Sequence, residues 1–454
     1  MTLPVQAPAP FGAPTLDRAV PTRTTAALTQ PGLTERALTV LTTFVFLHQI
    51  PNVWLQTRAE TVADTSNPLL VVVMLALIGL AFARVAGSVD HLITMFRLET
   101  TLYLFAGLTF ASTFWSADPA ATMRRSIVFV AVTLFGSYLV MRFSLDQIIR
   151  LLAAMFVLSA AVNLFFVLGL PQYGLDAAGR WTGVFSQKNA LGYTAALGLP
   201  TLVVAARAWR PGRLVFYPTA AAQIALLLGS ESKTMLVAAL GPTCLMAVYH
   251  LFRSRKTLRG AVMLSLGGSA VFTLAFATAN IGLLARWLDK DVTLTGRVPL
   301  WENLIPIALE RPLLGHGFGA TFAGYFSPIH EVWIQNLWNP SHAHNALLQI
   351  WLEMGMIAVV LFLILYTRAL TRAIKIVAIV PGTVGLWPLA LLTTTLLVSI
   401  TESGMSAEPM GWMMFVVAVL SVSLHLMYRA ELGLSNDLRE ATAANAQERR
   451  SRHR

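Results

Sequence analysis

The 454-residue chain has few charged side chains and almost no cysteine. Charged residues make up 12% of it and hydrophobic residues 56%. Since a soluble domain carries about 25% charged residues, this composition excludes a soluble globular protein and indicates an integral membrane protein. The one cysteine, Cys244, lies within an apolar stretch, which excludes disulfide bonds and a thiolate metal site.

The chain also lacks the alternation of apolar and polar residues that a membrane-spanning β-barrel requires. Its apolar runs are continuous and long enough for helices that cross a bilayer. The sequence therefore predicts an all-α polytopic protein with about 12 transmembrane helices and one large periplasmic loop that contains short helices. The predicted spans lie near residues 37–55, 68–85, 100–115, 126–141, 148–170, 190–206, 214–230, 234–252, 261–285, 346–367, 384–402 and 411–428.

The sequence predicts three parts along the chain. Residues 1–35 are rich in Pro, Thr and Ala without an apolar core, and we expect a disordered cytoplasmic tail there, not a cleaved signal peptide. Residues 36–428 form the transmembrane domain, in which residues 286–345 are the large outer loop. Residues 429–454 are polar and basic, and we expect a second cytoplasmic tail.

The net charge of +11 does not indicate nucleic-acid binding, because the basic residues lie in the short loops between the spans. With the N-terminus placed in the cytoplasm, about two thirds of the 33 Lys and Arg residues fall on the cytoplasmic side. We therefore expect both termini in the cytoplasm and the loop of residues 286–345 outside.

Four outer cations lie in particular settings. Arg180 and Lys188 belong to the segment GRWTGVFSQKN, and Lys233 lies in the turn SESKT between two predicted spans. Arg297, in TGRVPLW, precedes an apolar stripe at helical spacing that reaches Leu309, so it lies beside free backbone N–H groups, where a phosphate binds well. We predict that these four residues bind an anion; pairing within the protein is the alternative.

The segment HAHN lies directly before the span that starts near Ala346, with Asn345 as a helix cap. His342 and His344 are a candidate metal pair, but the outer loop shows no matching cluster of Asp, Glu and His, so no metal is predicted. We expect His344 to be a general base, because an imidazole titrates near neutrality; the alternative is a structural role at the helix start. The secondary candidates are His342, Arg124, Arg125 and Glu402, of which Glu402 flanks the last outer loop and is expected to orient an acceptor or pair with an arginine.

The motifs TGR, WEN, PLLGHGFG and HAHN, the last followed after nine residues by Gly355, resemble the O-antigen ligase and O-antigen polymerase superfamily of bacterial envelope glycosyltransferases. Within it, the chain is similar to exopolysaccharide polymerases of the ExoQ type, over most of residues 100–430. In that family a sugar chain linked to a lipid diphosphate is transferred to an acceptor hydroxyl on the periplasmic side, without a metal ion. The resemblance implies a diphosphate site and a base made of Arg180, Lys188, Lys233, Arg297 and His344.

Two positions depart from the family pattern. The ligase pattern carries Gly, Thr or Tyr where this chain has Ala358, which weakens the ligase subtype more than the superfamily. The SESKT turn carries Lys233 where arginine is more usual, which keeps the charge but loses the bidentate fork of a guanidinium.

The resemblance thus implies a metal-independent inverting glycosyltransferase of the bacterial inner membrane, without a cofactor and without nucleic acid as a partner. Its donor would be an undecaprenyl-diphosphate-linked oligosaccharide and its acceptor a sugar hydroxyl on another lipid-linked repeat unit. The expected further partners are flippase and chain-length regulator proteins. Two alternatives are a ligase acting on lipid A-core or a protein acceptor, and a non-enzymatic transporter of lipid-linked sugar, which would place charges or broken helices at mid-membrane.

Overall fold

The structure, a computed structural model, describes residues 31–48, 76, 79, 89–251, 297–322, 327–330, 332, 334, 340–380, 382–403 and 409–452. These residues are almost entirely helical, and the one pairing of extended backbone among them is an isolated bridge between Leu175 and Trp181. The prediction of an all-α fold is therefore confirmed. Contacts divide the chain into one unit, Pro31–Ser423, and a second, Met1–Gln30 with Leu424–Arg454. Every residue of the candidate site described below lies in the first unit.

The helices follow one another along the chain with short connections where the structure describes them. They are α1 (Leu33–His48), α4 (Val89–Leu98), α5 (Thr100–Ala111), α6 (Pro119–Arg142), α7 (Leu145–Gly169), α8 (Pro171–Gly174), α9 (Lys188–Ala208), α10 (Arg213–Gly229), α11 (Lys233–Leu251), α14 (Arg297–Glu310), α16 (Ala346–Ile379), α17 (Trp387–Thr401) and α19 (Pro409–Arg452), with 3₁₀ turns at Ser112–Trp115, Arg210–Gly212 and Val384–Leu386.

Six of the described helices are long and apolar enough to cross a membrane. They coincide with the spans predicted near residues 126–141, 148–170, 190–206, 346–367, 384–402 and 411–428. The chain is thus a multi-pass membrane protein. The spans predicted near 68–85 and 261–285 lie outside the described residues, apart from residues 76 and 79, so the count of about twelve and the orientation in the membrane stay predictions.

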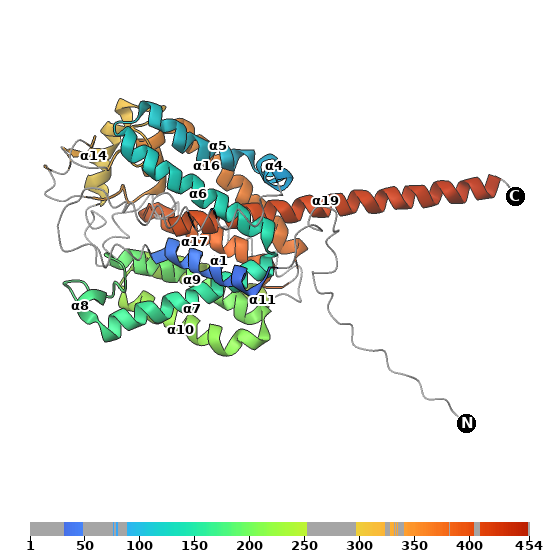
Figure 1. The fold of residues 1–454 in the computed structure, drawn as a ribbon, viewed down its shortest axis with the longest axis horizontal. Helices are drawn as coiled ribbons and strands as arrows, with labels where there is room; N and C mark the ends of the chain where they lie inside the picture. Colours follow the sequence, from blue (N-terminus) through green and yellow to red (C-terminus); the bar gives the residue numbers. More distant parts are fainter. Residues whose placement is uncertain are drawn as a thin grey trace, which may run out of the picture. The chain divides into compact units, whose positions relative to one another are not determined.

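Two groups of helices surround α17. Helices α7, α9, α10 and α11 pack together, and α5 packs against both α6 and α16 (Figure 1). Helix α17 contacts α9 and α11 in one group and α16 in the other. The C-terminal end of α17 is therefore placed where side chains from both groups can meet.

The described part of residues 286–345, the segment predicted to be the outer loop, shares a small apolar core with α16. In α14, Leu300, Leu304 and Ala308 are buried and pack with Ile329 and Leu352, among others. The apolar stripe predicted for this helix is narrower than expected, because the structure leaves its last member, Leu309, 58% exposed. This core fixes helix α14 on α16. Arg297, the first residue of α14, is thereby held near the start of α16.

Helix α16 is kinked at Gly355, which has φ 75°. A Cβ there would lie 2.0 Å from the Leu313 carbonyl oxygen, so the close approach of the two segments requires glycine. The N–H groups of His316 and Gly317 bond to the carbonyls of Leu352 and Glu353 at 2.9 and 2.8 Å. The GHGFG segment therefore fastens the outer loop to the kink of α16, and these two N–H groups are engaged by the helix.

Candidate functional site

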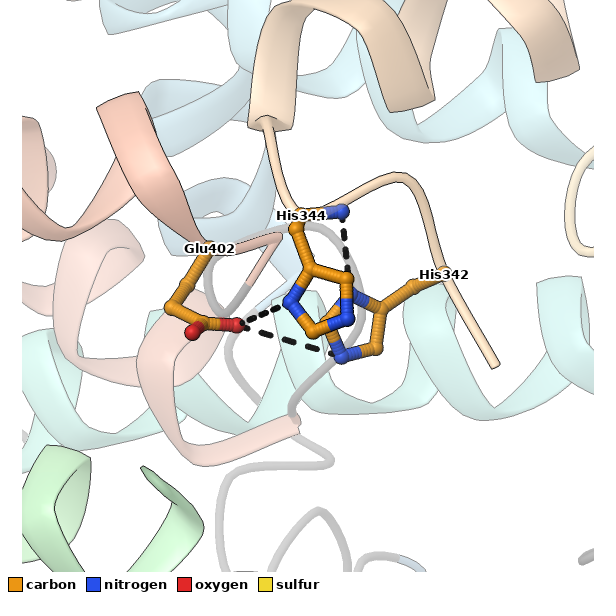
Figure 2. A group of neighbouring side chains, drawn as sticks. All are labelled: His342, His344 and Glu402. Atoms are coloured by element: carbon orange, nitrogen blue, oxygen red, sulfur yellow. Dashed lines mark hydrogen bonds and ion pairs between the residues drawn. The ribbon is translucent and has the colours of Figure 1, made fainter. Parts of the chain in front are cut away.

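Glu402, the C-cap residue directly after α17, lies at the centre of a polar cluster and is 5% exposed. Its Oε1 accepts hydrogen bonds from Asn189 Nδ2 at 2.8 Å and from Arg297 Nη2. Its Oε2 lies 2.9 Å from His344 Nδ1 and 4.0 Å from His342 Nε2. Figure 2 shows both imidazoles turned toward this carboxylate. One carboxylate thus joins residues from three separate segments to the end of α17.

The histidine loop, residues 342–344, is held in place through Ala343, the residue between the two histidines. Its N–H donates to Gln349 Oε1 at 2.7 Å, and its carbonyl accepts from Trp301 Nε1 at 2.8 Å. On the other side of His344, Asn345 caps α16 by accepting from the Leu348 N–H at 2.9 Å and donates to the Ile400 carbonyl at 3.1 Å. Both neighbours of His344 are therefore anchored, which restricts where its imidazole can lie.

The backbone of His344 is strained. Its φ is 50°, in the left-handed region that side chains other than glycine rarely adopt, and Glu231 shares this φ of 50°. A conformation of this kind costs about 1–3 kcal/mol and tends to be kept at functional sites. The strain at His344 is consistent with a residue placed for chemistry rather than for helix capping alone.

When an imidazole is neutral, its hydrogen-bond partners decide which ring nitrogen carries the hydrogen, and they assign different tautomers to His342 and His344. A carboxylate only accepts hydrogen bonds, so in neutral His344 the hydrogen lies on Nδ1, which donates to Glu402. The lone pair then lies on Nε2. His342 Nδ1 accepts from the backbone N–H of His344 at 3.2 Å, so its hydrogen is on Nε2, which faces Glu402. The arrangement therefore gives His344 Nε2 the electronic state that a general base needs.

The charges of the cluster follow from burial and from these partners. Burial lowers the pKa of His342 to about 3, helped by the neighbouring His344, so His342 is neutral at physiological pH. Burial alone would raise the pKa of Glu402, but the hydrogen bond from His344 and the charge of Arg297 lower it below its usual range. Glu402 is accordingly an ionised carboxylate, which favours the positive charge that the imidazole of His344 gains when it accepts a proton.

Three of the four predicted anion-binding cations are the first residues of helices. Lys188 begins α9, Lys233 begins α11, and Arg297 is the first residue of α14 as the structure describes it; none of these helices has an acidic residue in its first turn. A cation at the positive end of a helix dipole is unfavourable by roughly 0.3–1 kcal/mol. Cations and helix starts placed together in this way favour a bound anion.

The two lysines approach the cluster through their neighbours in sequence. Lys188 Nζ donates to the Glu231 carbonyl at 3.5 Å, and Asn189, the next residue, bonds to Glu402. Ser232, the residue before Lys233, donates to Asn189 Oδ1 at 3.1 Å. The segment with Lys188 and the turn with Lys233 are therefore connected to each other and to Glu402.

Arg180 has a strong partner elsewhere. Its Nε lies 2.7 Å from Asp176 Oδ2, and its N–H donates to Asp176 Oδ1 at 3.0 Å. Burial alone would raise the pKa of Asp176, but these hydrogen bonds lower it. Arg180 is thus paired within the protein, the alternative left open from the sequence. Its positive charge also contributes to the lowered pKa of Lys188, after burial.

Arg124 and Arg125 lie near the start of α6. Arg125 donates to the Gly319 carbonyl and so fastens the GHGFG segment to α6. The structure gives this arginine a role in holding the outer loop and does not place it among the groups that contact Glu402 in the described part of the chain.

The histidine pair does have an acid beside it, which comes from outside the outer loop. Ligand atoms of His342, His344 and Glu402 lie within 4.8 Å of one another, because the packing of α17 on α16 brings Glu402 to the loop. The set fits a metal ion poorly, however. His342 Nε2 would have to lose its hydrogen, which puts a hydrogen on Nδ1 against the His344 N–H, and Arg297 already binds Glu402.

Sequence reasoning missed Asn189, Gln349 and Trp301, which position the charged groups. Asn189 directly follows Lys188 at the end of the GRWTGVFSQKN segment, so its place in the site was within reach of the sequence. Gln349 and Trp301 looked like ordinary residues of apolar helices, and only their contacts with Ala343 reveal their role.

Two comparisons with known proteins bear on this site. Residues 218–363 match the family model described as O-Antigen ligase, a range that holds Lys233, Arg297, His342 and His344. Over 303 residues the chain is 28% identical to the exopolysaccharide production protein ExoQ of Rhizobium meliloti (strain 1021), covering 63% of this chain and 68% of that protein. The chain is therefore similar to the O-antigen ligase superfamily and to exopolysaccharide proteins of the ExoQ type, as the sequence motifs indicated.

Proposed function

We propose that the protein is a glycosyltransferase that polymerises undecaprenyl-diphosphate-linked oligosaccharide repeat units into a surface polysaccharide at the periplasmic face of the inner membrane. The observation that carries this proposal is the His344–Glu402 pair beside Arg297 and close to the helix starts that hold Lys188 and Lys233. A base and a cluster of cations are the two things that transfer from a lipid diphosphate needs.

The cations would bind the donor diphosphate. This leaving group gains negative charge as its bond to the sugar breaks, and fixed cations stabilise that charge most in the transition state. The guanidinium of Arg297 has five N–H donors, and the bond to Glu402 uses one nitrogen, so the same side chain can contact both the carboxylate and a phosphate. The site thus needs no metal ion to neutralise the diphosphate.

His344 would activate the acceptor. The acceptor hydroxyl transfers its proton to His344 Nε2, its oxygen bonds to the anomeric carbon, and the bond from that carbon to the diphosphate oxygen breaks. Attack opposite the leaving group inverts the anomeric configuration. Glu402 stabilises the imidazolium through Nδ1–H and holds the tautomer required, in the manner of the carboxylate in a catalytic triad.

The assignment as a polymerase is supported by the similarity to ExoQ, an exopolysaccharide production protein, over 63% of the chain. It is also supported by Ala358, which departs from the ligase pattern. Ligation of a finished polysaccharide to lipid A-core or a protein is the second candidate, because the matching family model is described as O-Antigen ligase.

The proposal is tested by the polysaccharide of a deletion strain. A strain without a polymerase should accumulate single repeat units on lipid diphosphate, and the parent gene, but not the His344→Ala variant, should restore full-length polymer. Accumulation of full-length polymer that is not attached to its acceptor would instead support ligation. Repeat units retained on the cytoplasmic side would support a transporter and contradict the proposal.

A further inference from the structure

Asn189 connects the anion-binding segments to the base. Its Nδ2 donates to Glu402 Oε1 at 2.8 Å, and its Oδ1 accepts from Ser232 Oγ at 3.1 Å. The bonds form a chain from Ser232 through Asn189 and Glu402 to His344 Nδ1. Lys188 and Lys233 are the sequence neighbours of Asn189 and Ser232. The two segments expected to hold the donor and the group expected to activate the acceptor are thus linked by side-chain bonds between Ser232, Asn189, Glu402 and His344.

The orientation of the Asn189 amide is determined by its partners. Glu402 is an ionised carboxylate and only accepts, so the NH₂ group must face it, and the amide oxygen is left to accept from the Ser232 hydroxyl. With Arg297 on the same oxygen, Asn189 fixes Oε1 and thereby the plane of the carboxylate. That plane decides whether Oε2 meets His344 Nδ1–H at 2.9 Å.

We propose that Asn189 is a positioning residue for the proposed transfer: it holds the Glu402 carboxylate in the plane that keeps His344 ready to accept a proton, and Ser232 holds Asn189. This inference rests on the proposed function and names a residue that acts through Glu402 without touching the reacting atoms. The alternative is a bond that only ties α9 to the end of α17, in which case the loss of Asn189 would reduce stability and leave the chemistry of folded protein intact.

The experiment compares Asn189→Ala and Asn189→Asp with the parent and with a matched control. Gln187→Ala is that control, because Gln187 is two residues away, is exposed and makes no side-chain cap bond to α9. Chain extension of a synthetic undecaprenyl-diphosphate-linked oligosaccharide is measured against donor concentration and pH on protein that elutes as a single folded species.

Asn189→Ala should lower kcat by roughly 10–100-fold, the loss expected for a hydrogen bond to a charged group, with the donor KM within about threefold of the parent. Asn189→Asp should be worse than Asn189→Ala at pH 8, because two adjacent carboxylates repel. Its activity relative to the parent should rise as the pH falls, since a proton shared by Asp and Glu402 restores a donor to Oε1. The proposal would be overturned by either of two results. One is an activity ratio between Asn189→Asp and Asn189→Ala that is the same at every pH, and the other is turnover of both variants within threefold of the parent.

A second readout does not depend on activity. Diethylpyrocarbonate modifies neutral imidazole, and peptide mass spectrometry resolves His344 from His342. A second carboxylate beside Glu402 favours the imidazolium, so Asn189→Asp should slow the labelling of His344 at pH 7 at least threefold, while Gln187→Ala should not. If the parent fails to extend chains, the proposed transfer falls while this slowing still supports the positioning of His344 through Asn189. An unchanged labelling rate in Asn189→Asp refutes the positioning even in an active enzyme.

Discussion

Replacing Glu402 by glutamine is the sharpest perturbation of the site, because it removes one charge and keeps the shape. The wild-type carboxylate accepts from Asn189, Arg297 and His344, and all three are donors. A glutamine offers one oxygen and one NH₂ group. Whichever way the amide of this glutamine lies, its NH₂ group faces a donor. We expect the amide oxygen to take the place of Oε1, because two donors, Arg297 and Asn189, point at that position.

The NH₂ group of the introduced glutamine would then face His344 and require the tautomer with the lone pair on Nδ1 and the hydrogen on Nε2. In that tautomer His344 cannot accept a proton from the acceptor. Loss of a positioned general base costs on the order of 10²–10⁴-fold in rate, and the comparable change in a serine protease triad costs about 10⁴-fold. We therefore expect kcat of Glu402→Gln to fall by about 10²–10⁴-fold, with a much smaller change in the donor KM.

The change also affects stability, since the side chains of Arg297 and Glu402 are 13% and 7% exposed. Breaking a buried ion pair by removing one partner costs about 3–5 kcal/mol. Turnover must therefore be expressed per folded protein, with a thermal melt of each variant. Glu302→Gln is a suitable control, because it makes the same chemical change on the exposed face of α14, near Arg297. Turnover of Glu402→Gln within threefold of the parent would refute the tautomer argument.

Three further predictions address other parts of the site. Arg297→Ala should reduce polymer formation by at least tenfold, since a hydrogen bond to a charged group contributes about 1.5–3 kcal/mol, and Arg297→Lys should restore it only in part because the fork is lost; equal activity of all three proteins would remove Arg297 from the site. The pKa of His342 is about 3 and that of Glu402 is lowered. The bonds of ionised Glu402 to His344 and Arg297 are therefore complete above about pH 4.5 and are lost only as the pH falls through the depressed pKa of Glu402. The acid limb of kcat between pH 5 and 8 should then report one proton, and a limb of two protons would contradict this. Gly355→Ala should lower the thermal melting temperature, because φ 75° alone costs about 1–3 kcal/mol for alanine and the Cβ meets the Leu313 carbonyl; an unchanged melt would show that the kink relaxes freely.

The helical class and the chemically important loop could be predicted because both leave local signals. Continuous apolar runs predicted the helices, and cations on the side predicted to be periplasmic, where they are disfavoured, drew attention to Lys188, Lys233 and Arg297. In the structure these cations are the first residues of three helices. The histidine loop was visible from its two imidazoles beside a helix cap.

The partners of these groups could not be predicted, because they depend on how helices pack. Glu402 is 58 residues from His344 along the chain, and only the contact of α17 with α16 brings the two together. Asn189 directly follows Lys188, but it is neutral and gives no charge bias, and its bond to a residue 213 positions away depends on how the helices pack. Arg180 shows the opposite case, since its partner Asp176 lies only four residues away, in the turn after α8, and pairing within the protein was left open from the sequence.

The central claim is that this protein itself joins lipid-linked repeat units with His344 as the base, and a reconstituted reaction tests it most directly. Purified protein is incubated with synthetic undecaprenyl-diphosphate-linked repeat units in the presence of EDTA, and chain length is followed on a gel together with released undecaprenyl diphosphate. The account predicts a ladder of longer chains, one lipid diphosphate released for each new linkage, an inverted anomeric configuration at each linkage, and no ladder with His344→Ala. Failure of the parent to lengthen the chains, or a His344→Ala variant that lengthens them at the parent rate, would contradict it.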